Sequence, residues 1–186
     1  MNKRILFILL VGLTFLPIVS NADGLLRYMR VYEVKALGLE VWTEKYPNWD
    51  IELEHINGQP IFIAESPRNY YPPSVMTVTT FKKLNVDKNE LKEVAQSAFE
   101  QSAKNFGVSG KEISKLKIQA QEFKHLKGYE TTFDGVANGE NVTVRVFIGR
   151  QEGKPVVSMM AYTYRGKISH IKEQLRRTWD NVSYLK

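Results

Sequence analysis

Residues 129–148, YETTFDGVANGENVTVRVFI, have a sequence pattern that is typical of two paired strands. Two runs in this stretch, residues 129–136 and 142–148, are rich in β-branched and aromatic residues, as is typical of strands. Asn138-Gly139 between them predicts a tight hairpin, because glycine tolerates the positive φ that a primed turn requires. The stretch therefore predicts a pair of antiparallel strands.

More strands are expected on both sides of this hairpin. The expected strands span residues 39–42, 49–54, 60–64, 74–81, 116–123 and 156–164, with turns at Asn57-Gly58 and Glu152-Gly153. In residues 49–54, Trp49, Ile51 and Leu53 alternate with acidic residues, which predicts a half-buried strand. The amino-terminal stretch of the mature chain, before Leu39, is expected to be mobile.

Two amphipathic helices interrupt and close this series of strands. Asp87 with Glu90 three residues later forms a variant of the capping box, and Gly107 ends the first predicted helix. The second helix is predicted from apolar residues at spacings of three and four, which are Ile168, Ile171, Leu175, Trp179 and Val182. Strands and helices in this order predict an α+β domain, in which helices cover an antiparallel sheet.

The first 22 residues have the pattern of a cleavable export signal. Lys3 and Arg4 precede an apolar run over residues 5–19, and the small residues that a signal peptidase reads end at Ala22. The apolar run is shorter than the roughly 20 residues that span a bilayer. We expect cleavage after Ala22, no retained transmembrane anchor, and a mature protein in the periplasm or outside the cell.

Residues 23–186 are expected to form one globular domain. Their 164 residues suffice for one core, and the chain has no cysteine that could form a disulfide. Removal of Lys3 and Arg4 lowers the basic count from 26 to 24, against 20 acidic residues. Residues 165–177 alone carry a net charge of +4, so the rest of the domain is balanced. This distribution argues against a nucleic-acid binder built on a broad basic surface.

The order of elements, with Gly38-Leu39-Glu40-Val41 and Tyr46-Pro47-Asn48-Trp49 ahead of the first helix, resembles the PsbP/DcrB-like superfamily. The resemblance covers about residues 36–184. It implies an antiparallel sheet of about seven strands sandwiched between helices, in α/β/α layers. It also implies an accessory or partner-binding role, because members of that superfamily share no catalytic site.

The residue inventory agrees with a non-catalytic role. His55, His125 and His170 lack the helical spacing of a metal site, and Glu54 and His55 point to opposite faces of a strand. The chain has no Cys and no Gly-x-Ser-x-Gly elbow, although a dispersed Ser/His pair remains an alternative. We expect no catalytic residue, no metal and no cofactor.

Two exposed features are candidates for partner binding. Tyr70 and Tyr71 lie between prolines in a loop expected to be exposed, and tyrosines are favoured at interfaces. Arg165, Lys172 and Arg176 fall within about 40° on one flank of the last predicted helix. We expect the tyrosines to anchor a protein partner and the basic residues to steer it. Alanine at both tyrosines is expected to leave the domain folded, because loop residues contribute little to a core.

The sequence therefore predicts an exported accessory or partner-binding protein, and an immunity-type protein that blocks a toxin is one specific form. Two alternatives stay open. One is a hydrolase with a dispersed Ser/His site. The other is a protein that binds anionic headgroups at the envelope surface through the basic stripe.

Overall fold

A computed structural model describes residues 27–81, 86 and 90–186. The predicted export signal, residues 1–22, and the capping residue Asp87 lie outside the described residues. No described helix is long and apolar enough to cross a membrane.

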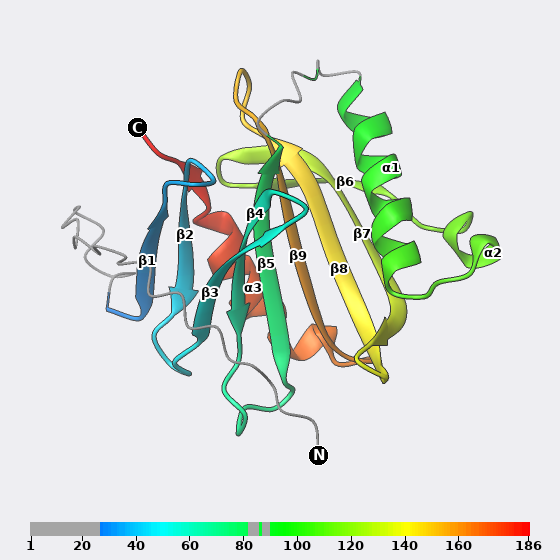
Figure 1. The fold of residues 1–186 in the computed structure, drawn as a ribbon, viewed down its shortest axis with the longest axis horizontal. Coiled ribbons are helices and arrows are strands. Elements are labelled where there is room, and N and C mark those ends of the chain that lie inside the picture. The colour runs from blue at the N-terminus through cyan, green and yellow to red at the C-terminus, as the bar shows by residue number, and fades with distance from the viewer. Residues whose placement is uncertain (1–26, 82–85, 87–89) are drawn as a thin grey trace.

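The described chain forms two antiparallel sheets with helices on both faces of the larger one (Figure 1). The strands are β1 Met29–Val34, β2 Leu39–Glu44, β3 Asp50–Ile56, β4 Gln59–Glu65, β5 Ser74–Phe81, β6 Gln119–Phe123, β7 Leu126–Ala137, β8 Glu140–Arg150, β9 Val156–Tyr164 and β10 Ser183–Tyr184. The helices are α1 Glu90–Asn105, α2 Gly110–Ile113, the 3₁₀ helix η1 Ile168–Ile171, and α3 Lys172–Asp180.

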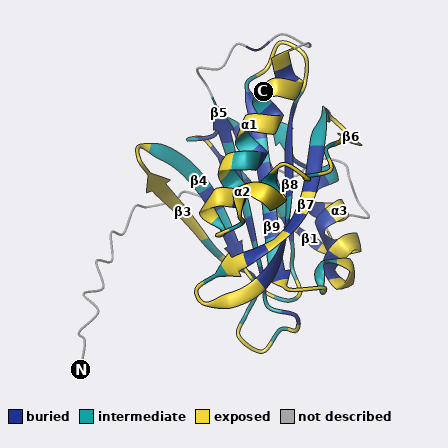
Figure 2. Cartoon of the chain, turned by 90° about the vertical axis from the view of Figure 1, so that its right-hand side faces the viewer, coloured by how far each residue is buried: buried dark blue, intermediate teal, exposed yellow. Residues whose placement is uncertain are grey.

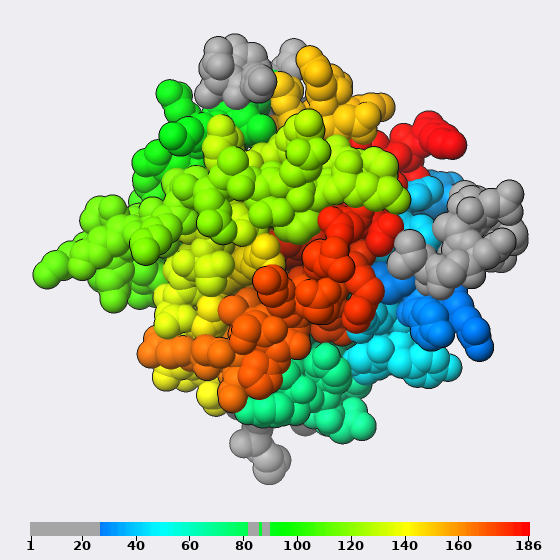
Figure 3. All heavy atoms as spheres, turned by 180° about the vertical axis from the view of Figure 1, so that it is seen from behind, coloured from blue at the N-terminus to red at the C-terminus, as the bar shows by residue number. Residues whose placement is uncertain are grey.

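The larger sheet has seven strands in the order β3-β4-β5-β9-β8-β7-β6, and the smaller has three in the order β1-β2-β10. In Figure 1, α1 lies in front of β7 and β8 while α3 lies behind the sheet, and Figure 3 shows α3 on the opposite face. The predicted α+β class and its seven-stranded antiparallel sheet are confirmed.

The predicted hairpin at residues 129–148 is β7 and β8, and its turn has the expected backbone. Asn138 and Gly139 have φ values of 52° and 84°, and Asn57 and Gly58 at the β3–β4 turn have 53° and 77°. Two consecutive residues with positive φ define the primed turn that suits the twist of two paired strands. Both Asn-Gly turns therefore fix the register of the strands that they join.

The core has two parts, one on each face of the larger sheet. Alternate residues of β8, namely Val144, Val146 and Ile148, face α1 and pack with its buried face, Leu91, Ala95, Phe99 and Ala103. On the other face, Phe147 of β8 packs with Trp179 and Leu175 of α3 and with Leu39 and Val41 of β2. The predicted apolar faces of both helices are therefore the buried ones.

The structure corrects three expectations about secondary structure. Residues 29–34, expected to be mobile, form β1, whose Met29, Tyr32 and Val34 are buried. The last helix is divided into η1 and α3, and α2 was not expected. In β3, Trp49 before the strand is buried, but Leu53 is 38% exposed, because β3 is an edge strand whose outer half has no covering layer.

Tyr184 joins β10 to the β8–β9 turn and generates a pH-dependent prediction. Its hydroxyl donates to the carbonyl oxygen of Pro155, and burial raises the pKa of Tyr184 from 10.0 to about 12. When the pKa of a group is higher in the folded state than in the unfolded state, the group stabilises the fold. This stabilisation is fully present below the pKa of the unfolded state and is lost as the pH rises through the pKa of the folded state. We expect Tyr184→Phe to lose less unfolding free energy than the wild type between pH 9 and pH 12, roughly the interval of the shift. Urea denaturation across that interval measures the two slopes, and equal slopes would contradict the assignment.

Candidate functional site

Four tyrosines are exposed at one end of the molecule, and we call this surface the tyrosine end. Tyr28, Tyr46, Tyr71 and Tyr164 are 64%, 84%, 66% and 40% exposed. They come from the two ends of the β1–β2 hairpin, from the β4–β5 loop and from the end of β9. Rigid, amphipathic rings with this degree of exposure are typical contact residues of protein interfaces.

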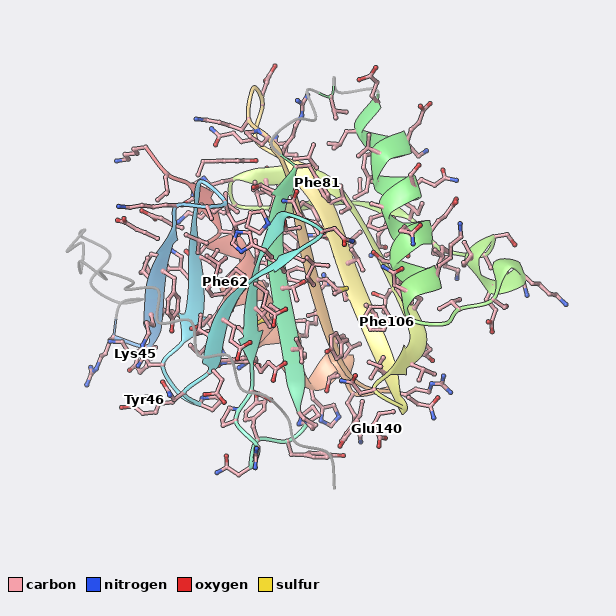
Figure 4. The ribbon with its side chains drawn as sticks, in the orientation of Figure 1. Lys45, Tyr46, Phe62, Phe81, Phe106 and Glu140 are labelled. Atoms are coloured by element: carbon pink, nitrogen blue, oxygen red, sulfur yellow. The ribbon has the colours of Figure 1, made fainter. Side chains whose placement is uncertain are left out.

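The sheet topology brings these segments to one end. Tyr28 precedes β1, and Tyr46 follows β2, whose last residue pairs with the first residue of β1. The loop with Tyr71 joins β4 to β5, and Tyr164 ends β9, which runs antiparallel to β5. In Figure 4, the labelled Tyr46 and Glu140 lie at this end, whereas Phe81 at the end of β5 lies at the other.

A hollow of about 230 Å³ opens at the tyrosine end beside Tyr71. Its lining includes Glu65, Val75, Glu140, Tyr162 and Tyr164. The Tyr71 ring packs against that of Tyr164, which lines the hollow, with centroids 6.4 Å apart. Burial, and then the neighbouring Glu65 carboxylate, raise the pKa of Tyr162. The hollow therefore combines aromatic rings with two carboxylates.

A second hollow, of about 310 Å³, lies between the start of β1, the end of β2 and α3. It is lined by Tyr28, Met29, Glu44, Tyr46 and Arg177. Glu44 forms an ion pair with Arg177 and also accepts a hydrogen bond from Gln174 Nε2 at 2.8 Å. The hollow therefore combines two exposed tyrosine rings with a charge pair that is already satisfied.

Tyr70, predicted as an exposed partner contact, has a different position from Tyr71. Its ring packs against Trp49 with centroids 6.3 Å apart and joins the core on the α3 side of the sheet. Its hydroxyl donates to Gln174 Oε1 at 3.3 Å. Burial, and then the Glu44 carboxylate, raise the pKa of Tyr70. Tyr70 thus holds the loop against α3, and Tyr71 is the one that faces solvent.

The three predicted basic residues do not form one stripe on a helix. Arg165 lies in the turn between β9 and η1, where it forms an ion pair with Asp134 at 3.5 Å. Lys172 begins α3 and is exposed. Arg176 pairs with Glu173 at 3.3 Å and with Asp180 at 4.0 Å. The helical-wheel prediction fails for Arg165 because the chain turns at Gly166, which has a φ of 74°, before the helix begins.

The described histidines are not arranged as a catalytic or metal site. His55, His125 and His170 are exposed, and they lie on β3, in the β6–β7 turn and on η1. In residues 27–81, 86 and 90–186, no group of three His, Cys, Asp or Glu side chains could hold a metal ion. Within the same residues, no side-chain hydrogen bond joins any of these imidazoles to a serine.

The most buried ion pair of the described residues, Arg145 with Glu130, lies within the sheet. Arg145 Nη2 donates to Glu130 Oε2 at 2.6 Å, and Glu130 also accepts from Gln119 Nε2 at 2.6 Å. The Arg145 guanidinium lies 5.3 Å from the Trp179 ring centroid. Buried charges require such partners, and this pair connects the sheet to α3.

Sequence reasoning did not identify Tyr28, Tyr46 or Tyr164. A signal was present for Tyr46, since it precedes Pro47 in a turn just as Tyr71 precedes Pro72. No local signal marks Tyr28 or Tyr164, which become neighbours of the other tyrosines only through strand pairing.

Comparison with known proteins supports the fold. No model of a known protein family matches the chain, and no curated protein matches it by sequence. A protein of Bacteroides thetaiotaomicron has a similar structure, with a TM-score of 0.55 and 9% identity over 86% of this chain. The chain spans about half of that protein, since the match covers 48% of it.

Two further solved structures match across most of both chains. LpqN, involved in cell envelope biogenesis of Mycobacterium tuberculosis, has a TM-score of 0.52 and 11% identity over 80% of this chain and 83% of its own. Cyanobacterial PsbP (CyanoP) from Synechocystis sp. PCC 6803 has a TM-score of 0.52 and 11% identity over 84% and 92%. The chain therefore has a PsbP-like fold, as the sequence resemblance implied.

The different positions of the two loop tyrosines generate a stability prediction. We expect Tyr70→Ala to lower the free energy of unfolding by roughly 2–3 kcal/mol, because it removes a partly buried ring and a hydrogen bond. Tyr71→Ala is the matched control and should change it by less than about 0.5 kcal/mol. Urea denaturation measures both. A destabilised Tyr71→Ala protein, or an unaffected Tyr70→Ala protein, would contradict these positions.

Proposed function

We propose that this chain is an exported, non-catalytic accessory protein that binds a protein partner through the tyrosine end. The observation that carries the proposal is that four exposed tyrosines lie at one end of the molecule, where Tyr71 packs on Tyr164 beside one hollow and Tyr28 and Tyr46 line the other. Exposed tyrosines scattered singly need no explanation, whereas a cluster beside two hollows offers rigid contact area at a low cost in side-chain entropy.

Within this proposal the tyrosines differ in role. Tyr71, with Tyr164 behind it, supplies the anchor beside the first hollow, and Tyr46 supplies a second contact beside the other. Tyr70 positions the loop through Gln174. Lys172 is exposed at the start of α3 and would steer an acidic patch of the partner during association, whereas Arg165 and Arg176 already pair with carboxylates.

The export part of the proposal rests on the sequence. The basic, apolar and small-residue segments of residues 1–22 form a signal-peptide pattern, and the chain has no thiol. The periplasm is the compartment we propose. An immunity-type protein is one form of this function, in which the tyrosine end covers a toxin that arrives there.

The two other candidate functions have less support. A hydrolase needs a base in contact with a nucleophile, and the three histidines of the described chain stand apart on the surface. Binding of anionic headgroups needs free cations on one face, whereas Arg165 and Arg176 already pair with carboxylates.

A photo-crosslinking residue at position 71 tests the proposal in the native host. We expect it to join the protein to one protein partner, because position 71 is at the rim of the proposed interface. The same residue at position 125 is the matched control, since His125 is exposed in the β6–β7 turn at the other end of the sheet. Crosslinking from both positions to the same set of proteins, or from neither, would contradict the proposal.

The affinity of the crosslinked partner then tests the anchor. We expect Tyr71→Ala to weaken the complex at least tenfold, because a buried aromatic anchor commonly contributes about 2 kcal/mol or more. Lys154→Ala, in the turn at the opposite end, is the control and should bind like the wild type. Isothermal titration calorimetry with the identified partner measures both, and an unchanged affinity for Tyr71→Ala would exclude Tyr71 as the anchor.

A further inference from the structure

Strand β3 has an open outer edge. It is the edge strand of the seven-stranded sheet and pairs only with β4 among the described strands. Residues 52–58, which include the outer half of β3 and its turn, are all exposed. Figure 2 shows this hairpin projecting from the body of the sheet, with β3 exposed along most of its length. A strand with this position presents a row of unpaired backbone N–H and C=O groups.

The side chains of β3 have a regular pattern. Asp50, Glu52 and Glu54 point to one face, and Ile51 and Leu53 point to the other. None of the three carboxylates forms an ion pair within residues 27–81, 86 and 90–186. A strand that pairs with β3 would therefore meet a row of unneutralised negative charge.

The acidic row continues to the tyrosine end. Asp50 pairs with Glu65 of β4, and Glu65 lines the hollow beside Tyr71. Glu52 and Glu54 stand opposite Ile63 and Ile61 of β4, both partly exposed. A basic side chain laid across this face could place its methylene stem on an isoleucine and its charge beside a carboxylate.

We propose that the outer edge of β3 binds an extended segment of the partner in which basic residues alternate with apolar ones. This inference rests on the proposed function, because it names the chemistry of one segment of that partner. The segment adds a strand to the sheet, so main-chain hydrogen bonds supply affinity and alternate side chains supply specificity. β3 has seven residues, which is about 23 Å at 3.3 Å per residue.

A second copy of this chain is a poor occupant of the same edge. Two copies of β3 paired about a two-fold axis would place both acidic rows on the same face of the joined sheet. Like charges directly opposite one another destabilise a strand pair. The acidic row therefore selects against self-association while favouring a basic strand.

A synthetic seven-residue peptide of alternating lysine and valine is the probe. We expect it to bind the mature protein, with an affinity that falls as salt rises, because exposed charges are screened. The same peptide with glutamate in place of every lysine should not bind. Glu52→Lys together with Glu54→Lys should weaken binding of the lysine peptide at least about tenfold, since like charges then face each other.

Glu122→Lys is the matched control for Glu52→Lys alone, because each replaces one exposed acid and Glu122 lies on β6, the edge strand at the opposite side of the sheet. It should bind the lysine peptide like the wild type. Equal losses in the β3 and β6 variants would show a general charge effect and would overturn the proposal.

Backbone methylation of the peptide separates strand addition from simple charge attraction. In a strand, alternate N–H groups point toward the neighbouring strand. We expect N-methyl groups at either the odd or the even positions of the peptide to abolish binding, while the other set leaves binding intact. Equal binding of both methylated peptides would overturn strand addition.

The outcomes keep this inference separate from the proposed function. Crosslinking of one partner from position 71 without any binding of the lysine peptide would overturn the β3 site and leave the proposed function standing. A dimer in sedimentation that the β3 double variant dissociates would make the occupant a second copy and would also overturn the inference.

Discussion

Strand β8 is buried on both faces of the larger sheet, and this burial determines how the neighbouring strands and helices can pack. Its alternate residues serve two cores, with Val144, Val146 and Ile148 against α1 and Phe147 toward α3. A strand with no solvent-facing side leaves no freedom of register, because a shift of one residue would exchange its two faces. The register of the central strands is therefore fixed, and side chains that are free to contact a partner lie at the strand ends and at the sheet edges.

This constraint explains where binding features can occur. Helices α1 and α3 occupy the two faces over β8, so the exposed aromatic side chains lie at the ends of β1, β2 and β9 and in the β4–β5 loop. The network from Tyr70 through Gln174 to Glu44 fixes one of these loops against α3 and β2. An interface formed on such ends is held by rigid elements, although its own residues contribute little to stability.

The sequence predicted what local patterns determine. Strand alternation, both Asn-Gly turns and the apolar faces of α1 and α3 are local, and the structure confirms them. It could not predict that Leu53 is exposed, since burial depends on which strand forms the edge. The position of Arg165 before the helix and the contact of Tyr70 with Trp49 depend on tertiary packing. The tyrosine end forms only when the ends of several strands come together in the fold. Of its four tyrosines, the sequence therefore predicted only Tyr71 as a partner contact.

Hydrogen exchange of the protein with and without its crosslinked partner shows whether binding occurs at strand ends and at one edge while the layered core stays unchanged. Backbone amides gain protection where a partner covers or pairs with them. We expect new protection in residues 45–56 and 66–73, with no change in β6 or along α1. New protection along α1, or in β6 and not in these two segments, would contradict it.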